Sequence, residues 1–191
     1  MGNAFTAVAD DIYGVYYNPA GLGTLPRPQF GTSYSKLFTG LKDGSDLNDQ
    51  FFGYAHPLTG GRHGTLAVAW NSFSVNNSLY KENQYYLSYG RLMSKGLAGG
   101  ELYGGASLKY LTRSYGVLPE TSNAVAAGGI ARTGSADPVL AERRKMAPDL
   151  DLGVLYRLGS HYSVGAALTH ALQPNVAFGA SIVVYNSFLP Q

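Results

Sequence analysis

Apolar and polar residues alternate along most of the chain, with a period of two in segments of about ten residues. In the clearest segment, residues 149–158, leucine, valine and tyrosine occupy the even positions, and aspartate, glycine and arginine occupy most odd ones. This is the period of a β-strand with two different faces. It also predicts strands at residues 28–38, 50–57, 65–71, 84–90, 101–110, 162–169 and, less regularly, 176–187. We therefore expect an all-β, antiparallel fold of about eight strands with almost no helix.

Two architectures accommodate such strands. A soluble sandwich turns its apolar faces inward, whereas a membrane barrel turns them toward lipid and places small or polar residues in its lumen. The polar faces here carry mostly Gly, Ser, Thr, Ala and Gln, while a soluble sheet exposes more Lys and Glu. Aromatic residues gather toward the segment ends, where membrane barrels carry aromatic girdles. Both features favour the membrane barrel.

The lengths of the predicted connections support the same choice. Long connections, at residues 39–49, 74–82 and 114–147, alternate with short ones at residues 58–63, 94–100 and 159–161. Alternate connections of an antiparallel barrel lie at opposite ends, and outer-membrane barrels have long loops at one end and tight turns at the other. We predict an antiparallel transmembrane β-barrel in the cell outer membrane, in contact with membrane lipid.

Composition excludes several other classes. Charged residues make up 14% of the 191 positions, against about 25% in an average domain. The net charge of +2 is too small to indicate a nucleic-acid partner. The absence of cysteine excludes disulfides and thiolate metal sites. No apolar run approaches the roughly 18–20 residues of a membrane helix. The chain starts without the pattern of a leader peptide, which we expect to be absent from this sequence.

Residues 18–23, NPAGLG, precede the first predicted strand. Asn18 suits a helix N-cap, Pro19 suits the first helical position, and Gly21 and Gly23 suit a left-handed helix stop. The pattern predicts a short turn or a one-turn helix. On these residues alone, a surface turn and a plug enclosed by a larger structure both remain open.

Two blocks of the sequence resemble a known family. GNAFTAVADDIYGVYYNPAGLG resembles the N-terminal signature of the FadL-like outer-membrane proteins, which include hydrophobic-compound transporters and PorV. GGASLKYL and DLDLGVLYRLGSHYSVGAALTHALQPNVAF are similar to consecutive strands of the PorV-type branch. The resemblance implies an N-terminal hatch at residues 1–27, with a small-residue helix at residues 4–11, inside a barrel of about fourteen strands. The hatch motif falls on Asn18, Pro19, Ala20 and Gly21.

Residues 28–191 are then expected to form the N-terminal part of that barrel. An eight-stranded barrel has an interior just wide enough for its own side chains, so it has no room for a hatch of about 25 residues. The chain also ends at LPQ, without the terminal aromatic residue of a complete outer-membrane barrel. A larger barrel is therefore expected around the hatch.

The sequence offers little catalytic chemistry. The four histidines lack metal-ligand spacing, and no nucleophile elbow or phosphate-binding loop is present. Asp149 and Asp151 share a strand face, but with Arg157 on the same face we predict a polar pair of the lumen wall, Asp151 with Arg157, in place of a catalytic carboxylate pair. We expect no catalytic residue, no metal, no cofactor and no enzymatic activity.

Three functions follow from the barrel and the resemblance. The first is passage of hydrophobic small molecules such as long-chain fatty acids, gated by the hatch, with a hydrophobic ligand or detergent in the lumen. The second is a PorV-like role in a protein secretion or surface-attachment system, with exported proteins or machine partners bound through the connection at residues 114–147. The third is a structural subunit of a larger outer-membrane assembly.

Overall fold

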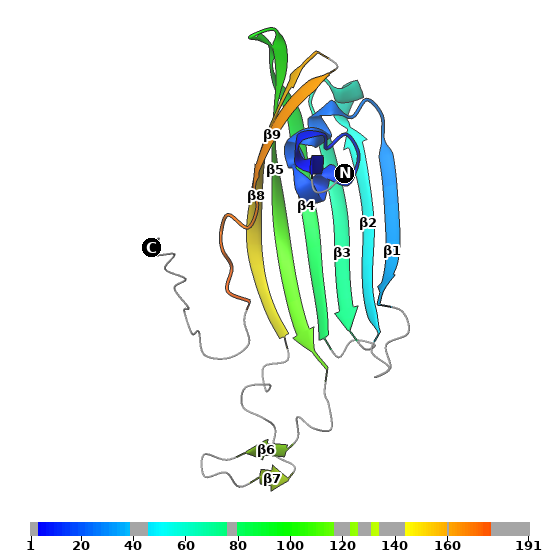
Figure 1. Ribbon diagram of the computed structural model, residues 1–191, viewed down its shortest axis with the longest axis vertical. Helices are drawn as coiled ribbons and strands as arrows, with labels where there is room; N and C mark the ends of the chain where they lie inside the picture. Colours follow the sequence, from blue (N-terminus) through cyan, green and yellow to red (C-terminus); the bar gives the residue numbers. More distant parts are fainter. Residues whose placement is uncertain are drawn as a thin grey trace.

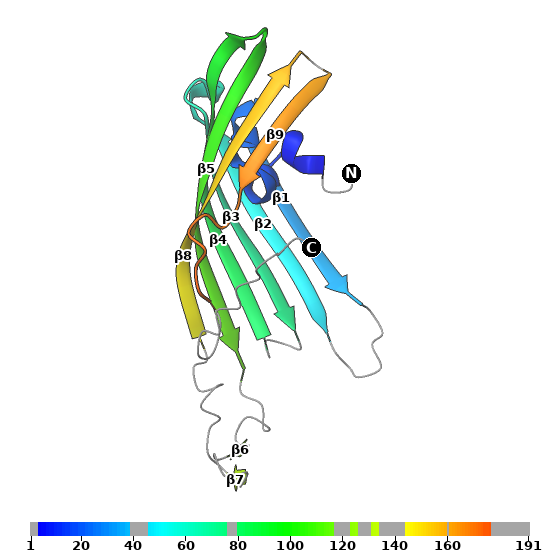
Figure 2. The same ribbon diagram turned by 60° about the vertical axis from the view of Figure 1, so that its left-hand side comes forward.

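The chain forms one curved antiparallel sheet of seven strands, in the order β1-β2-β3-β4-β5-β8-β9 (Figure 1). The computed structural model describes residues 4–38, 46–75, 80–116, 123–125, 131–133, 144–159 and 161–176. The strands of the sheet are β1 (Gln29–Leu37), β2 (Leu47–Pro57), β3 (Thr65–Val75), β4 (Tyr80–Leu97), β5 (Gly100–Tyr115), β8 (Arg144–Leu158) and β9 (Tyr162–Leu168). A separate antiparallel pair consists of β6 (Asn123–Val125) and β7 (Ala131–Thr133). The sheet curves into half a barrel (Figure 2), which confirms the predicted fold class.

Several strands are longer than the alternation predicted. β3 ends at Val75 and β4 begins at Tyr80, so the connection expected at residues 74–82 spans only residues 76–79. Polar residues of the predicted connection, such as Ser74 and Lys81, are instead paired across β3 and β4. Similarly, β5 continues to Tyr115 and β8 begins at Arg144. The strand predicted at residues 176–187 lies, apart from Val176, outside the described residues.

The outer face of the sheet is apolar. Large apolar side chains on this face are exposed, among them Leu66, Val68, Leu87, Leu108, Leu152 and Val154. Their neighbours in the sequence face the concave side and are small, such as the buried Ala67, Ala69, Ser88 and Ser107. A continuous exposed apolar face is unfavourable in water and favourable against lipid hydrocarbon. The orientation of the two faces is thus the one predicted for a membrane barrel.

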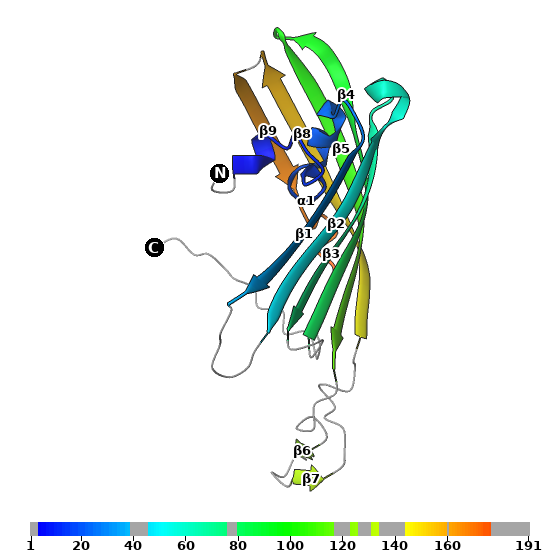
Figure 3. The same ribbon diagram turned by 90° about the vertical axis from the view of Figure 1, so that its right-hand side faces the viewer.

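An N-terminal segment, residues 4–25, lies against the concave face (Figures 2 and 3). It contains η1 (Ala4–Ala7), α1 (Gly14–Tyr17) and η2 (Pro19–Thr24), and a further short turn, η3 (Leu58–Gly61), joins β2 to β3. The helix expected at residues 4–11 is shorter than predicted, because Ala9 has a positive φ of 36°. Within the residues described, no helix combines the length and the apolar character that crossing a membrane requires.

The core lies between this segment and the sheet. Its buried members come from both sides: Ile12, Val15, Leu22 and Leu25 from the segment, and Phe51, Ala55, Ala67, Ala69 and Tyr86 from β2, β3 and β4. The concave face contributes mainly small side chains, so the larger apolar side chains of the segment fill the space above them. The fold therefore buries apolar area inside the half-barrel while leaving apolar area on its outer face.

Candidate functional site

Asn18 anchors the N-terminal segment to the sheet. It is completely buried, and its side-chain Nδ2 donates to the carbonyl of Thr6 at 2.8 Å and to that of Val154, in β8, at 3.0 Å. Its Oδ1 accepts a hydrogen bond from the Ala20 amide at 3.1 Å, at the start of η2. The predicted N-cap at Asn18 and the first helical position at Pro19 are confirmed. The side-chain amide of Asn18 also joins two distant parts of the chain, Thr6 and Val154.

The hatch motif rests on a row of glycines. Gly90, Gly105 and Gly153 are paired with one another across β4, β5 and β8, and we call them the glycine row. A Cβ atom on Gly90 would lie 2.4 Å from the Pro19 oxygen, and one on Gly105 would lie 2.3 Å from the Pro19 carbonyl carbon. On Gly153 it would lie 2.1 Å from Asn18 Oδ1. Because real Cβ contacts are not this short, only glycine permits the segment to approach so closely.

Gly21 and Gly23 serve the same close packing. Neither has a positive φ, so the predicted left-handed helix stop is wrong. A Cβ on Gly21 would lie 2.0 Å from the Ala9 oxygen, and one on Gly23 would lie 2.8 Å from the backbone of Arg91. Both positions require glycine because a side chain would have no room, and not because of the backbone conformation.

Further close contacts tie the segment to both sides of the sheet. The Ile12 side chain occupies the positions that Cβ atoms would take on Gly31 in β1 and on Gly53 in β2, at 2.5 and 2.9 Å. At the other side, a Cβ on Gly165 in β9 would lie 2.4 Å from the Thr6 oxygen. The segment therefore fits the concave face from one edge strand to the other.

The structure does not bring the predicted pair, Asp151 and Arg157, together. Both belong to β8 and face the concave side, but their positions are about 20 Å apart along the strand. Arg157 Nη2 instead donates to the Val8 carbonyl at 3.1 Å, and its guanidinium lies 6.0 Å from the centre of the Tyr103 ring. The two polar residues thus act at separate places on the wall.

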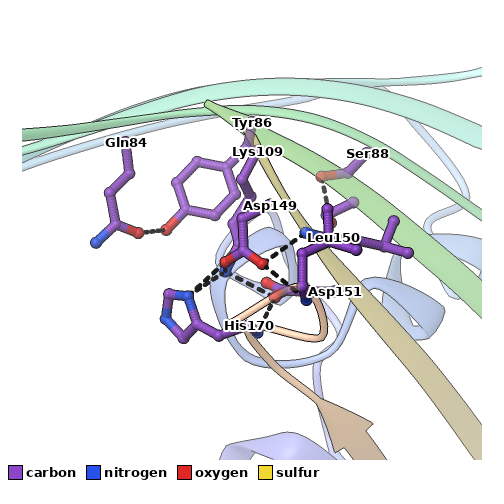
Figure 4. A network of polar contacts seen from close by, with 10 residues as sticks. Gln84, Tyr86, Ser88, Lys109, Asp149, Leu150, Asp151 and His170 are labelled. Carbon is purple, nitrogen blue, oxygen red and sulfur yellow. Dashed lines mark hydrogen bonds and ion pairs between the residues drawn. The ribbon is translucent and has the colours of Figure 1, made fainter. Parts of the chain in front are cut away.

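Asp151 belongs to a charge cluster with the buried Lys109 and Asp149 and the half-exposed His170 (Figure 4). Lys109 and Asp149 are directly opposite each other on β5 and β8. Lys109 Nζ lies 2.6 Å from Asp151 Oδ1 and 3.3 Å from Asp149 Oδ2. The side chains of these three residues are at most 3% exposed. A buried ammonium between two carboxylates compensates charges that would be strongly unfavourable alone.

His170 closes the cluster from the far end of β9. Its Nδ1 lies 2.5 Å from Asp149 Oδ2 and its backbone amide donates to Asp151 Oδ1 at 2.8 Å. The Leu172 amide also donates to Asp149, at 3.3 Å. The proximity of Nδ1 to a carboxylate places the proton on Nδ1. The carboxylates therefore bind the chain just beyond Leu168, where β9 ends.

Sequence reasoning missed Lys109 and His170 as partners of the two aspartates. Their side chains meet because of strand register and the turn after β9, which leaves no local pattern. The only available signal was Lys109 at an inward position of its predicted strand, where a charge needs a partner.

An open hollow of about 320 Å³ lies beside the N-terminal segment, lined by Tyr13, Tyr16, Tyr17, Ser33, Asp49, Phe51 and Asn71. The side chains around this hollow carry hydroxyl, amide and carboxylate groups, which make its lining largely polar. Nearby, burial raises the pKa of the Asp11 carboxyl, while a hydrogen bond from the Tyr13 amide at 2.8 Å partly offsets that effect. In the part of the chain that the structure describes, no three His, Asp or Glu residues are grouped so as to hold a metal.

A curved antiparallel sheet with an apolar outer face and a packed inner segment defines an outer-membrane β-barrel protein. The family model described as type IX secretion system membrane protein PorP/SprF matches residues 13–189. The chain belongs to this family of outer-membrane proteins. No curated protein and no solved structure matched it. The resemblance to FadL-like proteins thus indicated the membrane and the barrel correctly, but the match does not support the group of hydrophobic-compound transporters.

Proposed function

We propose that this protein is an outer-membrane component of a type IX secretion system and acts by binding protein partners. The match of residues 13–189 to the PorP/SprF family carries the proposal. It favours the second of the three functions expected from the sequence over passage of fatty acids. In this role the charge cluster is structural, and the protein needs no cofactor and has no enzymatic activity.

The way the N-terminal segment is held supports a fixed scaffold. A gate must leave its closed position at low cost, whereas this segment has Asn18, Ile12 and Leu22 buried against the wall. The glycine row fits its backbone without space for another position nearby. Displacement would expose the buried apolar side chains, each worth about 1.5–3 kcal/mol. A segment held in this way is better suited to stabilising the wall than to opening it.

The connection between β5 and β8 is the proposed partner-binding region. It spans residues 116–143 and includes the β6–β7 pair. It leaves the sheet at the end where β1 ends and β2 begins (Figure 1). Long connections in barrels of this kind are commonly functional.

Deletion of the gene in its host, with complementation, tests the proposal. We expect loss of the protein to lower the amount of secreted and surface-attached proteins, measured by quantitative proteomics of the medium and the cell surface. Uptake of radiolabelled oleate should stay unchanged. Normal secretion together with reduced oleate uptake would overturn the proposal and restore the transporter interpretation.

Replacing residues 118–140 by a short Gly/Ser linker tests the binding region. We expect the tagged variant to fold, as judged by heat-modifiable migration, but to lose the proteins that co-purify with the wild type. The matched control is the same replacement within residues 39–45, which we expect to retain those partners. Retention of all partners by the 118–140 variant would exclude this connection.

A further inference from the structure

The outward-facing residues of β2 to β8 change in chemical character toward the end with the long connections. One row across the strands, Tyr54–Val68–Leu87–Leu108–Leu150, is largely aliphatic. The next row on this face, Phe52–Trp70–Tyr85–Tyr110, is aromatic on β2 to β5, and its member on β8 is Pro148. Aromatic girdles mark the boundary between hydrocarbon and headgroups in membrane barrels. The membrane boundary at this end therefore follows the aromatic row.

Beyond the aromatic row the same face becomes polar on β2 to β5. Its next members on β2 to β5 are Gln50–Ser72–Asn83–Thr112, of which Ser72 and Thr112 are buried, and its member on β8 is the exposed Met146. Asn83 accepts a hydrogen bond from Trp70 Nε1 at 3.2 Å and donates one to Thr112 Oγ1 at 3.4 Å. These groups hold the indole and each other in place. On β2 to β5 the side chains of this row have the polar composition that is expected at headgroup depth.

One step further, Lys81, Ser114 and Arg144 are paired side by side on β4, β5 and β8. We call them the cationic row. The two cations flank the hydroxyl group and are separated by two strand spacings, about 10 Å. A strand tilt of about 40° changes the depth by roughly 3 Å per strand, so the row spans about 6 Å, which is within one headgroup layer.

The two cations differ from other charged residues near this end of the wall. Lys36 is paired with Asp46 at 2.9 Å, and Arg113, on the concave face, with Glu82 at 2.8 Å. Among the described residues, neither Lys81 nor Arg144 forms an ion pair. Two uncompensated cations around a hydroxyl, next to a membrane boundary, are complementary to a phosphate group.

We propose that Lys81, Ser114 and Arg144 bind the phosphate of a phosphorylated glycolipid headgroup in the outer leaflet. In outer-membrane barrels the long connections are extracellular, so the cationic row faces that leaflet. The cations bind the phosphate from both sides, Ser114 donates its hydroxyl proton to a phosphate oxygen, and the acyl chains lie along the aliphatic row. The site is independent of the secretion role and of the connection at residues 116–143.

Lipid titration tests the site. The full chain, purified in a zwitterionic detergent, is titrated with bisphosphorylated lipid A and with the same lipid after dephosphorylation, and bound lipid is counted by native mass spectrometry. Each cation near an anionic membrane surface strengthens binding by about fivefold. We therefore expect K81Q/R144Q to bind lipid A about 25-fold more weakly, and each single variant about fivefold more weakly. The dephosphorylated lipid should not distinguish the variants.

The matched control is Arg91→Gln, which removes an exposed cation from the outer side of β4 far from the aromatic row. We expect it to leave lipid A binding unchanged. Equal lipid A binding by wild type and K81Q/R144Q would overturn the proposal. So would displacement of the lipid by equimolar inorganic phosphate, which would indicate a site for a free anion. Unchanged lipid binding with loss of a co-purifying protein would assign the row to a protein contact instead.

Discussion

The glycine row and the charge cluster hold two pieces of chain against the same concave wall by opposite means. The glycine row fixes the hatch motif by omitting side chains, so the backbone of Pro19 and Ala20 lies directly on β5. The charge cluster fixes the turn after β9 through ionised side chains, with Lys109 between two carboxylates. The first should be sensitive to any added atom, and the second to any removed charge. Matched substitutions can separate these two kinds of sensitivity.

The largest effect is expected from enlarging the glycine row. Gly105→Val places atoms within 2.4 Å of the backbone of Pro19 and Ala20, and neither backbone can shift without losing the Asn18 bonds. We expect the N-terminal segment to undock, with a loss of stability greater than about 3 kcal/mol. Heat-modifiable migration in detergent measures that loss. Maleimide labelling of a Val15→Cys background, in a chain that has no other cysteine, reports undocking directly.

The neighbouring glycine supplies the control. On Gly104 a Cβ would meet only the flexible Met93 side chain, at 3.1 Å. Gly104→Ala should therefore change stability by less than about 1 kcal/mol, whereas Gly105→Ala should already be destabilising. Equal stability of the two alanine variants would show that the glycine row is not selected for close approach.

Removing the charge of Lys109 should come next. Lys109→Met leaves two carboxylates, each at most 3% exposed, with the His170 side chain and backbone amides as their remaining partners. Breaking a buried ion pair by removing one partner costs about 3–5 kcal/mol. We expect a loss of stability of that size, seen as a lower thermal midpoint, while Val15→Cys stays protected because the N-terminal segment is held elsewhere. Adding Asp149→Asn and Asp151→Asn should restore most of the loss, and a triple variant as unstable as the single one would contradict the charge argument.

A smaller effect is expected at Asn18. This residue lies closely against Gly153 of the glycine row and also holds the segment through side-chain hydrogen bonds. Asn18→Ala removes hydrogen bonds to Thr6, Val154 and Ala20 and leaves buried carbonyl groups without a donor. We expect a loss of about 2–3 kcal/mol. Asn18→Asp keeps the helix cap but loses the donor, so it should be no better than alanine. If the aspartate variant matched the wild type, the cap alone would account for the role of Asn18.

The smallest effect is expected at Asp11, which is half-buried in the segment. Burial raises the pKa of its carboxyl, so the folded state binds the proton more tightly than the unfolded state. Its contribution to stability is therefore present at low pH and lost as the pH rises through the folded pKa. Asp11→Asn keeps an acceptor for the Tyr13 amide and removes this dependence. We expect a thermal midpoint about 1–2 °C higher at pH 7 and no gain at pH 3, measured by the same migration assay.

The alternation along the chain was sufficient to predict the strands and their two faces, because both depend on the local period. Predicting the outer membrane also required the composition of the polar faces and the lengths of the connections. The helix cap at Asn18 and Pro19 could also be predicted, because a cap is recognised from adjacent residues. Strand ends were predicted less well, since polar residues such as Ser72 and Asn83 continue the strands beyond the aromatic row. In a soluble protein the same residues would mark a loop.

The candidate site could be predicted only in part, because many of its contacts join residues on different strands and depend on the strand register. Gly90, Gly105 and Gly153 come from distant parts of the sequence and form one row only when three strands align. The pairing of Lys109 with Asp149 has the same origin. Asp151 and Arg157 share a face, yet strand geometry separates them too widely for contact. The face on which a residue lies follows from the local sequence, whereas its contacts depend on the tertiary structure.

The bond between Asn18 and Val154 links residues 136 positions apart in the sequence. The N-terminal segment is synthesised before the strands that it contacts, yet its binding surface is incomplete until β8 has been added to β5. Docking of the segment must therefore be a late step of assembly, governed by long-range loop closure. Until then Asn18 and the apolar side chains around it remain open to other partners in the periplasm.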